Sequence, residues 1–207
     1  MRPSCEDLAS DRRSSDKVGS PSLVTVGHGT LTSDELVQLL EAKGVQQVVD
    51  VRSAPGSRRH PQFGRAEMER WLPAAHIDYR WEPDLGGFRR PVAGSVNTVL
   101  RHPSFRGYAD YMATDCFRAG LGRLLDDATQ RCTAVMCAES LWWRCHRRLI
   151  ADAAALMTGA AVWHLGHDGR VSLHRLTEGV RAVEKSETTW IVYDAGSAER
   201  HGVAREE

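Results

Sequence analysis

The sequence predicts an α/β fold, a single domain arranged as a three-layer sandwich with a largely parallel central sheet. Its 207 residues suit one compact domain and would be cramped for two. Strand-like and helix-like segments alternate along most of the chain, a pattern typical of helices that cover both faces of a parallel sheet. Polar, charged stretches flank this region. We therefore expect the domain at residues 22–195, between a disordered tail at 1–21 and a flexible tail at 196–207.

The first elements form a strand–helix–strand unit. The β-branched run at residues 23–27 ends in glycine and predicts a buried strand. Thr32 or Ser33 is a suitable N-cap for a helix that Gly44 ends, and valines then predict a second strand over 45–52. A βαβ unit of this kind implies parallel pairing of its two strands and a right-handed crossover.

The middle of the chain, residues 53–107, has weak periodicity and many prolines and glycines. Long irregular stretches of this kind are usually functional. We expect only a short helix at 65–72 and a strand at 77–80 within it. The periodicity of the remaining chain predicts helices at 108–112, 117–128 and 147–157, and strands at 133–137, 161–165 and 190–193.

Composition excludes some classes of protein and leaves others open. There are 27 basic and 27 acidic residues, so net charge gives no general argument for nucleic-acid binding. No apolar run approaches the roughly 20 residues that span a bilayer, which argues against a membrane protein. Five cysteines and a polar start without a signal-peptide core predict reduced thiols and a cytoplasmic location. Only three lysines accompany 24 arginines, and coding bias explains that excess as readily as anion binding does.

Polar and titratable side chains recur where the predicted strands end. Ligands of open α/β sheets bind beyond the carboxyl ends of the strands, so these side chains are candidates for a shared site. The residues that follow the first, second and third core strands include His28, then Asp50, Arg52, Ser57 and Arg58, then Cys137, Glu139, Cys145, His146 and Arg147.

The thiols carry the most specific chemistry. Cys137 ends a strand, and Cys145 lies near a helix amino terminus beside His146 and Arg147. Helix amides and neighbouring cations lower the pKa of a thiol and favour the nucleophilic thiolate. Glu139 could orient His146, act as an acid or base, or form a salt bridge to an arginine.

Two further interpretations of these residues stay open. Cys137, Cys145, His146 and His28 offer soft ligands such as zinc prefers, although the chain has no C-x-x-C pair. We therefore predict no cofactor but keep a bound metal as an alternative. Arginines near Phe63 could bind phosphate and stack a base, and Arg52 flanks a turn at the sheet edge.

Among those arginines, we favour Arg52 and Arg58 as anion ligands. Arg59 and Arg65 suit a solvated face equally well.

The motifs of the whole chain are, in order, Thr25-Val26-Gly27-His28, Val49-Asp50-Val51-Arg52 with Pro55 and Ser57-Arg58, Phe63, Leu85-Gly86-Gly87, Met136-Cys137-Ala138-Glu139 and Cys145-His146-Arg147.

Together these motifs resemble the DUF488 family over residues 23–167. The chain departs from the family at Gly29, where a small polar residue is usual, and in the segment 90–106, which is longer than in compact members. The family has no established general activity, so the resemblance implies the fold and the site better than the reaction. From the residues and this resemblance together, we expect catalytic roles for Cys137, Glu139, Cys145 and His146, and substrate binding by His28, Asp50, Arg52, Ser57, Arg58, Phe63, Gly86, Gly87 and Arg147.

A weaker similarity links the order of these elements to rhodaneses and cysteine phosphatases, in which loop amides hold an anion around a thiolate. Here the loop after Cys137 lacks glycine, and Arg144 lies too far from Cys137 for the usual C-x5-R spacing. We use this similarity only as an analogy.

The favoured function is a thiol-dependent hydrolase or transferase with a Cys/His/Glu/Arg pocket. Its substrate would be anionic: a nucleotide, a nucleic-acid fragment or a sulfur-containing small molecule. One alternative is a non-catalytic nucleic-acid-binding module, in which Trp142 and Trp143 contact bases and arginines contact phosphates. The other alternative is a metal-dependent hydrolase with Cys and His ligands.

Overall fold

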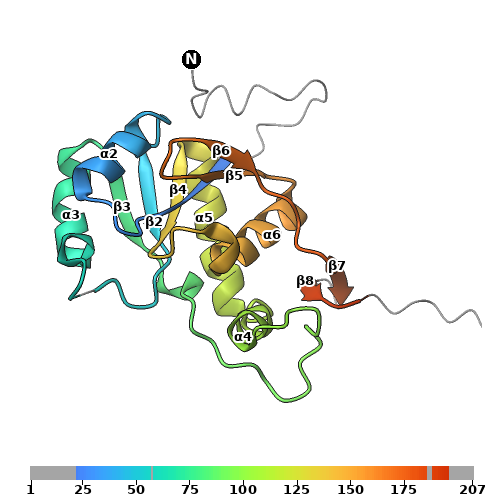
Figure 1. Cartoon of the computed structure of the whole chain (residues 1–207). Coiled ribbons are helices and arrows are strands. Elements are labelled where there is room, and N and C mark those ends of the chain that lie inside the picture. Colours follow the sequence, from blue (N-terminus) through green and yellow to red (C-terminus); the bar gives the residue numbers. More distant parts are fainter. Residues whose placement is uncertain (1–21, 57, 186–187, 196–207) are drawn as a thin grey trace, which may run out of the picture.

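The structure is a computed structural model that describes residues 22–56, 58–185 and 188–195 (Figure 1). The two predicted tails and the candidate residue Ser57 lie outside the described residues. A six-stranded sheet forms the centre, with the strand order β3-β2-β4-β1-β5-β6. The predicted fold class is therefore confirmed, because helices cover both faces of a mostly parallel sheet.

Five of the six strands run parallel, and β6 pairs antiparallel with β5. The predicted direct pairing of the first two strands is wrong, since β4 lies between β1 and β2 and pairs with both. The strands of this sheet are β1 (Ser22–Gly27), β2 (Gln47–Asp50), β3 (Asp78–Trp81), β4 (Thr133–Cys137), β5 (Ala161–Leu165) and β6 (Val171–Leu173).

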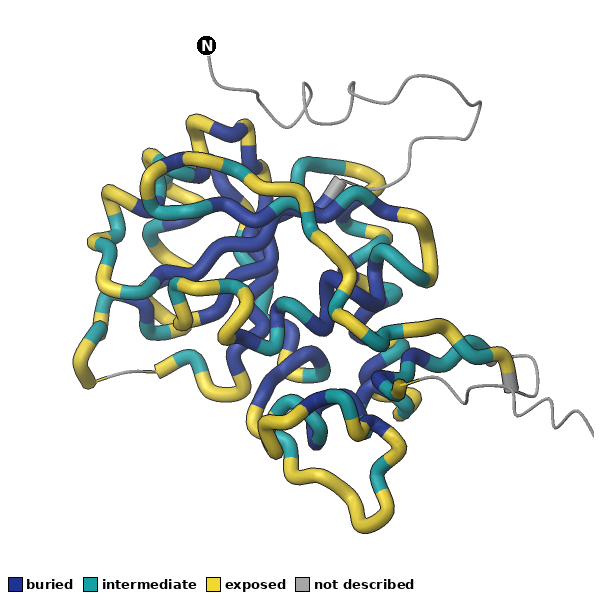
Figure 2. Tube along the Cα trace, turned by 45° about the vertical axis from the view of Figure 1, so that its right-hand side comes forward, coloured by how far each residue is buried: buried dark blue, intermediate teal, exposed yellow. Residues whose placement is uncertain are grey.

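The described α-helices form the outer layers. They are α2 (Ser33–Glu41), α3 (Arg65–Ala74), α4 (Pro103–Tyr111), α5 (Asp115–Gln130) and α6 (Arg147–Thr158). Alternate residues of each central strand face opposite layers. In β4, Met136 packs in the cluster of α2 and α3, whereas Val135 packs in the cluster of α4, α5 and α6. Figure 2 shows the result, with buried segments concentrated in the central strands and exposed loops around them.

Local sequence signals explain the ends of two helices. The Thr32 side chain accepts a hydrogen bond from the backbone of Glu35, and the Glu35 carboxylate accepts one from the backbone of Thr32. This capping box confirms the predicted start of α2. Gly159 has a left-handed φ of 68° and ends α6, because a glycine adopts that conformation without strain.

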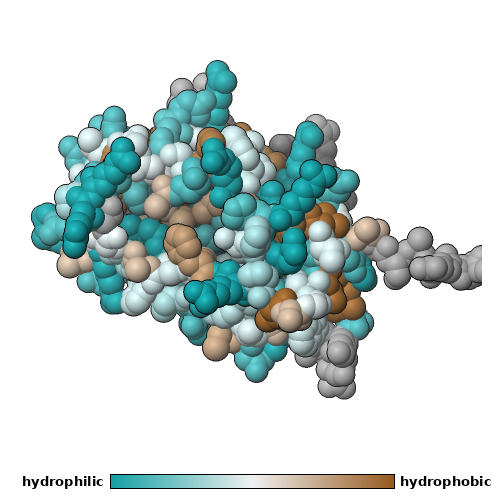
Figure 3. Space-filling view, turned by 60° about the horizontal axis from the view of Figure 1, so that its bottom comes forward, coloured by the Kyte–Doolittle hydropathy of each residue, from teal (hydrophilic) through white to brown (hydrophobic). Residues whose placement is uncertain are grey.

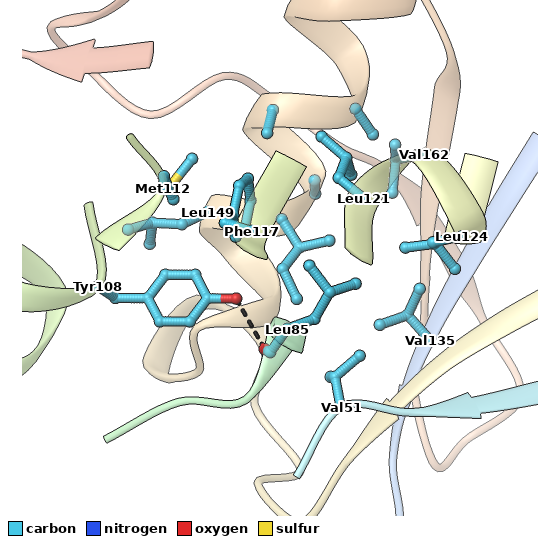
Figure 4. Packing of buried hydrophobic residues seen from close by; sticks show 14 of the residues in the cluster. Val51, Leu85, Tyr108, Met112, Phe117, Leu121, Leu124, Val135, Leu149 and Val162 are labelled. Atoms are coloured by element: carbon cyan, nitrogen blue, oxygen red, sulfur yellow. Dashed lines mark hydrogen bonds between the residues drawn. The ribbon is translucent and has the colours of Figure 1, made fainter. Parts of the chain in front are cut away.

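Contacts of Leu85 and Tyr108 anchor the irregular middle segment to the core (Figure 4). The 3-10 turn η2 (Pro83–Leu85) places Leu85 in the core, and the Tyr108 hydroxyl donates a hydrogen bond of 2.8 Å to the Leu85 carbonyl oxygen. The ring of Tyr108 lies edge-to-face with that of Phe117 from α5, with the centroids 6.0 Å apart. These contacts fix the loop that follows Leu85 against the helical layer.

A separate antiparallel hairpin of β7 (Val180–Lys185) and β8 (Thr188–Tyr193) lies beside α4 and α6 (Figure 1). The sequence predicted a strand at 190–193 but not its partner, and β8 does not join the central sheet. The hairpin is attached through Asp152 of α6, whose carboxylate accepts a hydrogen bond of 3.0 Å from the Tyr193 hydroxyl.

The strand register brings three loops together at one edge. Gly27 at the end of β1 is level with Cys137 at the end of β4, and Asp50 at the end of β2 is level with Met136. From β2 the chain continues to α3 on one face, and from β4 it continues to α6 on the other. Such a divergence opens a crevice at the carboxyl edge of a sheet.

A final feature of the helices concerns membranes. Among the described residues, no helix combines the length and apolarity needed to cross a bilayer.

Candidate active site

A hollow of about 570 Å³ opens at this carboxyl edge, and we call it the thiol pocket. Loops after β2 and β4, the segment before α4 and the turn η3 (Trp142–Arg144) form its walls. Its lining residues are Arg52, Ser53, Ala54, Gly87, Phe88, His102, Ser104, Phe105, Tyr108, Cys137, Ala138, Glu139, Trp143, Arg144, Cys145 and His146.

Two thiols and an imidazole meet in this pocket. The sulfur atoms of Cys137 and Cys145 and a ring nitrogen of His146 all lie within 4.8 Å of one another. The Cys145 Sγ is 3.6 Å from Nδ1 of His146, and Nε of Arg147 donates to the same sulfur at 3.4 Å. Cys137 ends β4, while the other three residues lead into α6, as the sequence predicted.

The surroundings separate the pKa values of the two thiols. A hydrogen bond from the Cys137 thiol is the largest influence that holds the pKa of Cys145 well below its ordinary value; burial opposes it, while His146 and Arg147 add to the lowering. The same hydrogen bond, burial and the charge on Cys145 hold the pKa of Cys137 well above its ordinary value. Of the two thiols, Cys145 is therefore the more acidic, and Cys137 is the one that donates to it.

The orientation of His146 is set by a backbone carbonyl. Its Nε2 lies 3.0 Å from the Val51 oxygen, which can only accept, so Nε2 carries the hydrogen. In the neutral ring, Nδ1 then presents its lone pair to the Cys145 sulfur. The ring of Tyr108 packs 5.0 Å from the imidazole, and Gly87 leaves room for it, since a Cβ there would lie 2.9 Å from Nδ1.

Arg147 is the largest buried side chain of the site, with 1% of its surface exposed. Its guanidinium donates to the Cys145 sulfur and to the Glu139 carbonyl oxygen. Within the described parts of the chain, Arg147 forms no ion pair with a carboxylate. A buried cation without a counter-ion is costly, so a thiolate at Cys145 would stabilise Arg147 as much as Arg147 would stabilise the thiolate.

Arg52 is also buried, but two of its three guanidinium nitrogens donate hydrogen bonds to the Asp50 carboxylate. Its Nε and Nη2 donate to Asp50 at 2.9 Å and 2.5 Å, and the Tyr79 hydroxyl donates to the same carboxylate. The remaining Nη1 lies 3.4 Å from Nε2 of His28. Burial, followed by the charge of Arg52, lowers the pKa of His28 to about 4, so this imidazole is neutral near pH 7.

A second hollow of about 520 Å³ adjoins the thiol pocket, and we call it the histidine pocket. Four residues line both hollows: Arg52, Ala54, Ala138 and Glu139. The other residues of the histidine pocket are His28, Gly29, Gly56, Arg59, His60 and Ser140. The predicted residue His28 therefore faces this neighbouring hollow rather than the thiols.

The structure does not bring every predicted residue to a pocket wall. Phe63 is fully buried and stacks under the His28 ring at 4.2 Å, which makes it a core residue. Gly86 is buried beside Ser53, and the exposed Arg58 lines neither pocket, whereas Arg59 lines the histidine pocket.

Glu139 also differs from the expectation. Its side chain is exposed, and its carboxylate accepts from the backbone of Leu141 instead of orienting His146, whose nitrogens face Val51 and Cys145. The salt bridge proposed for Glu139 is not formed either, since Arg147 contacts its carbonyl oxygen.

The state of the cysteines agrees only in part with the prediction. Cys116, Cys137 and Cys145 are free thiols. Cys132, just before β4, is disulfide-bonded, so the expectation of reduced thiols is wrong at that position.

The comparison with protein-family models now decides the family. The model described as "Domain of unknown function DUF488" matches residues 32–154, which is more than half of the chain. The chain belongs to the DUF488 family. The match contains Cys137 and the Cys145–Arg147 motif, while β1 with His28 precedes it, so it is narrower than the predicted range 23–167. Neither the comparison with curated proteins nor that with solved structures finds a match.

Several pocket residues of this DUF488 protein were not predicted from the sequence as site residues. They come mostly from the irregular segment and from α4, and they are Ser53, Phe88, His102, Phe105 and Tyr108, together with Arg144 of η3. The one sequence signal for them was the long aperiodic stretch over 53–107, which marked a functional region without indicating which side chains face the thiols.

The thiols and His146 could also hold a soft metal ion, since their ligand atoms are close enough together. A cation bound there would lie next to the buried guanidinium of Arg147, whose Nε is 3.4 Å from the Cys145 sulfur. The repulsion between two neighbouring positive charges in a buried site disfavours this use of the ligands.

Proposed function

We propose that this protein is a thiol-dependent hydrolase or transferase in which Cys145 is the nucleophile and the thiol pocket binds an anionic substrate. The observation that carries the proposal is the buried Arg147, which has no carboxylate partner among the residues that the structure describes and lies 3.4 Å from the Cys145 sulfur. This cation, the Cys137 thiol and His146 together favour a thiolate at neutral pH. A stabilised thiolate on the wall of a pocket is what nucleophilic catalysis by cysteine requires.

In the proposed reaction, the proton of the Cys145 thiol has passed to Nδ1 of His146 before the substrate binds. The thiolate attacks an electrophilic centre of the substrate, a bond to sulfur forms, and the bond to the leaving group breaks. The leaving group departs with the electron pair and receives the proton from His146. Water, in a hydrolase, or a second nucleophile, in a transferase, then cleaves the covalent intermediate and restores the thiolate.

The residues that line the thiol pocket suit a substrate that has both a flat apolar part and an anionic part. Phe105, Tyr108 and Trp143 supply aromatic surface, and the exposed Arg144 supplies a cation. Nucleotides and nucleic-acid fragments combine these two properties. The exposed carboxylate of Glu139, on the wall shared with the histidine pocket, serves as the base that activates water in the hydrolase version.

The proposal predicts an unusual pH dependence for alkylation of Cys145. An ordinary thiol, with a pKa of about 8.5, reacts faster with iodoacetamide as pH rises through 7 and 8. Because Cys145 is already a thiolate, its rate should change little over this range. Peptide-resolved mass spectrometry measures the rate at each pH, with the exposed Cys116 in the same molecule as the reference.

Two variants make this test specific. Cys137→Ala removes the donor to the thiolate and should shift the alkylation profile of Cys145 to higher pH, while Cys145→Ser should remove that labelled peptide altogether. Parallel pH profiles for Cys145 and Cys116 would overturn the proposal. Stoichiometric zinc in the purified protein, with Cys145 labelled only after chelation, would support the metal-dependent hydrolase instead.

A further inference from the structure

We propose that the substrate of this site is a single-stranded nucleic acid, bound along a groove of adjoining hollows with the Cys145 thiolate near its middle. The inference rests on the proposed function and names its substrate class. It starts from a third hollow of about 760 Å³, which we call the arginine pocket because Arg101, Arg148 and Arg175 line it.

The three hollows adjoin one another. His102, Phe105 and Trp143 line both the arginine pocket and the thiol pocket, and Arg52 and Glu139 line both the thiol pocket and the histidine pocket. Each hollow alone has a volume typical of a small-ligand site, about 300–1,000 Å³. A groove with three such subsites suits a ligand of several nucleotides better than a single one.

Four arginines of these hollows form no ion pair with a carboxylate in the described part of the chain, and among the described arginines outside the hollows only Arg58, Arg89, Arg90, Arg106 and Arg147 share that property. Eight arginines outside the three hollows each form an ion pair with a carboxylate: Arg65, Arg70, Arg80, Arg118, Arg123, Arg131, Arg170 and Arg181. By contrast, the groove residues Arg101, Arg144, Arg148 and Arg175 form no such pair within the described residues. Their charges remain available for phosphate groups.

Aromatic side chains lie among these cations. Trp143 is 49% exposed and Phe88, at the rim of the thiol pocket, is 95% exposed. The guanidinium of Arg148 lies 4.9 Å from the ring centre of Phe105, and its Nε is buried without a hydrogen-bond partner in the described structure. Figure 3 shows hydrophobic surface enclosed by hydrophilic groups on the face that includes α4. Arginines interleaved with exposed aromatics are typical of surfaces that stack unpaired bases.

The position of the thiolate favours a single strand over a duplex. Cys145 is buried, with 4% of its surface exposed, so a reacting group must enter the thiol pocket. A base within a duplex is stacked and paired and cannot enter without being flipped out, whereas a base in a single strand is free to do so.

Fluorescence anisotropy with labelled 12-mers of dT and rU tests the inference. We expect saturable binding by the full-length chain, with an affinity that falls steeply as salt increases. Arg101→Ala and Arg175→Ala should each weaken binding by about threefold to tenfold and reduce the salt slope by about 0.7. The matched control, Arg70→Ala on α3, removes an exposed arginine that is paired with Glu67 and should leave the affinity unchanged.

Two further ligands test the role of the bases. An abasic 12-mer should bind more weakly, because it offers no rings to Trp143 and Phe105, and a duplex of the same length should also bind more weakly. Equal binding of the single strand, abasic strand and duplex would overturn the inference, and so would the absence of binding at low salt.

Thiol reactivity is measured separately, as alkylation of Cys145 in the parent chain, while the Cys145→Ser variant should keep the affinity for the 12-mer. If the strand binds but Cys145 alkylation follows an ordinary thiol profile, the proposed enzyme fails while the groove stands. If the thiolate is confirmed but no strand binds, the substrate class fails and the enzyme stands.

Discussion

At the scale of single residues, the site depends on two positions that have no side chain. A Cβ on Gly27 would lie 1.9 Å from the Glu139 carbonyl oxygen and 2.9 Å from the Arg147 guanidinium. A Cβ on Gly87 would lie 2.9 Å from Nδ1 of His146. Because neither glycine carries a methyl group, the Arg147 guanidinium and the His146 imidazole can both reach the Cys145 sulfur.

The variant Gly87→Ala should displace the His146 ring from Cys145. We expect Cys145 to be alkylated several-fold more slowly at neutral pH, and overpacking should lower the free energy of unfolding by about 1–3 kcal/mol. The control is Gly122→Ala in α5, where a Cβ meets nothing within 4 Å. It should raise the free energy of unfolding by about 0.5–1 kcal/mol and leave the alkylation rate as in the parent, since helix interiors favour alanine. Unchanged alkylation of the Gly87→Ala variant would show that the position of His146 does not control the thiol.

At the scale of elements, the carboxyl ends of β1 and β2 are joined by charge and hydrogen bonds. Asp50 ends β2 and holds Arg52, which contacts His28 just after β1. All three side chains are buried, so the strand ends form a rigid wall, from which Arg52 lines both pockets and His28 lines the histidine pocket. A neutral His28 is part of this wall, because a second buried cation beside Arg52 would be repelled.

The pH dependence of stability should report this neutral histidine. Unfolded histidine takes up its proton near pH 6.5, whereas His28 in the folded chain does so only near pH 4. Unfolding therefore binds a proton between these values, and the free energy of unfolding should fall as pH decreases from 6.5 to 4. His164, with its pKa lowered to about 3 by burial and then by His174, acts in the same direction.

Urea unfolding at a series of pH values measures this dependence. The His28→Gln variant should show a smaller loss of stability between pH 6.5 and 4 than the parent, because the contribution of His28 to this loss is removed. A variant whose stability falls with pH as steeply as that of the parent would mean that His28 is protonated in the folded chain.

Elements with a clear period were predicted well from the sequence, and those without one were not. The strands at 133–137 and 161–165 have the predicted bounds, because each is a short apolar run between turns. The strand β6 and the charged strand β7 were missed, since neither has a buried face that would produce an alternating pattern.

The site was predictable where its residues are neighbours in sequence, as at Cys145, His146 and Arg147. Phe105 and Tyr108 of α4 reach the pocket only through the packing of this helix against the irregular segment at Leu85, which no local pattern encodes. Phe63 was assigned to substrate binding because an aromatic residue near arginines fits that role as well as a core role.

At the scale of the whole molecule, one buried carboxylate connects parts that are distant in sequence. Asp152 of α6 accepts hydrogen bonds from the His174 ring, from the backbone and hydroxyl of Thr177, and from the hydroxyl of Tyr193 in β8. His174 in turn contacts His164 of β5 at 2.9 Å. The central sheet, α6 and the carboxyl-terminal hairpin thus share one polar network, and Thr177 also lines the arginine pocket.

Removal of this carboxylate should therefore destabilise the whole molecule. We expect Asp152→Ala to lower the free energy of unfolding in urea by about 3–5 kcal/mol, because several buried donors lose their acceptor. The milder variant Tyr193→Phe removes one hydrogen bond to the same carboxylate and should cost about 1 kcal/mol. Equal effects of the two substitutions would contradict a central role for Asp152.

Because Cys137 and Cys145 lie close together, the site is sensitive to oxidation. Two sulfur atoms within 4.8 Å form a potential dithiol/disulfide couple, and the loss of two electrons and of the Cys137 proton to an oxidant would join the thiolate and the thiol in a disulfide. That bond would consume the nucleophile and the thiol that stabilises it in a single event. The reactivity of this site therefore depends on the reduction potential of its surroundings, and a reductant must be present whenever the thiolate is to be measured.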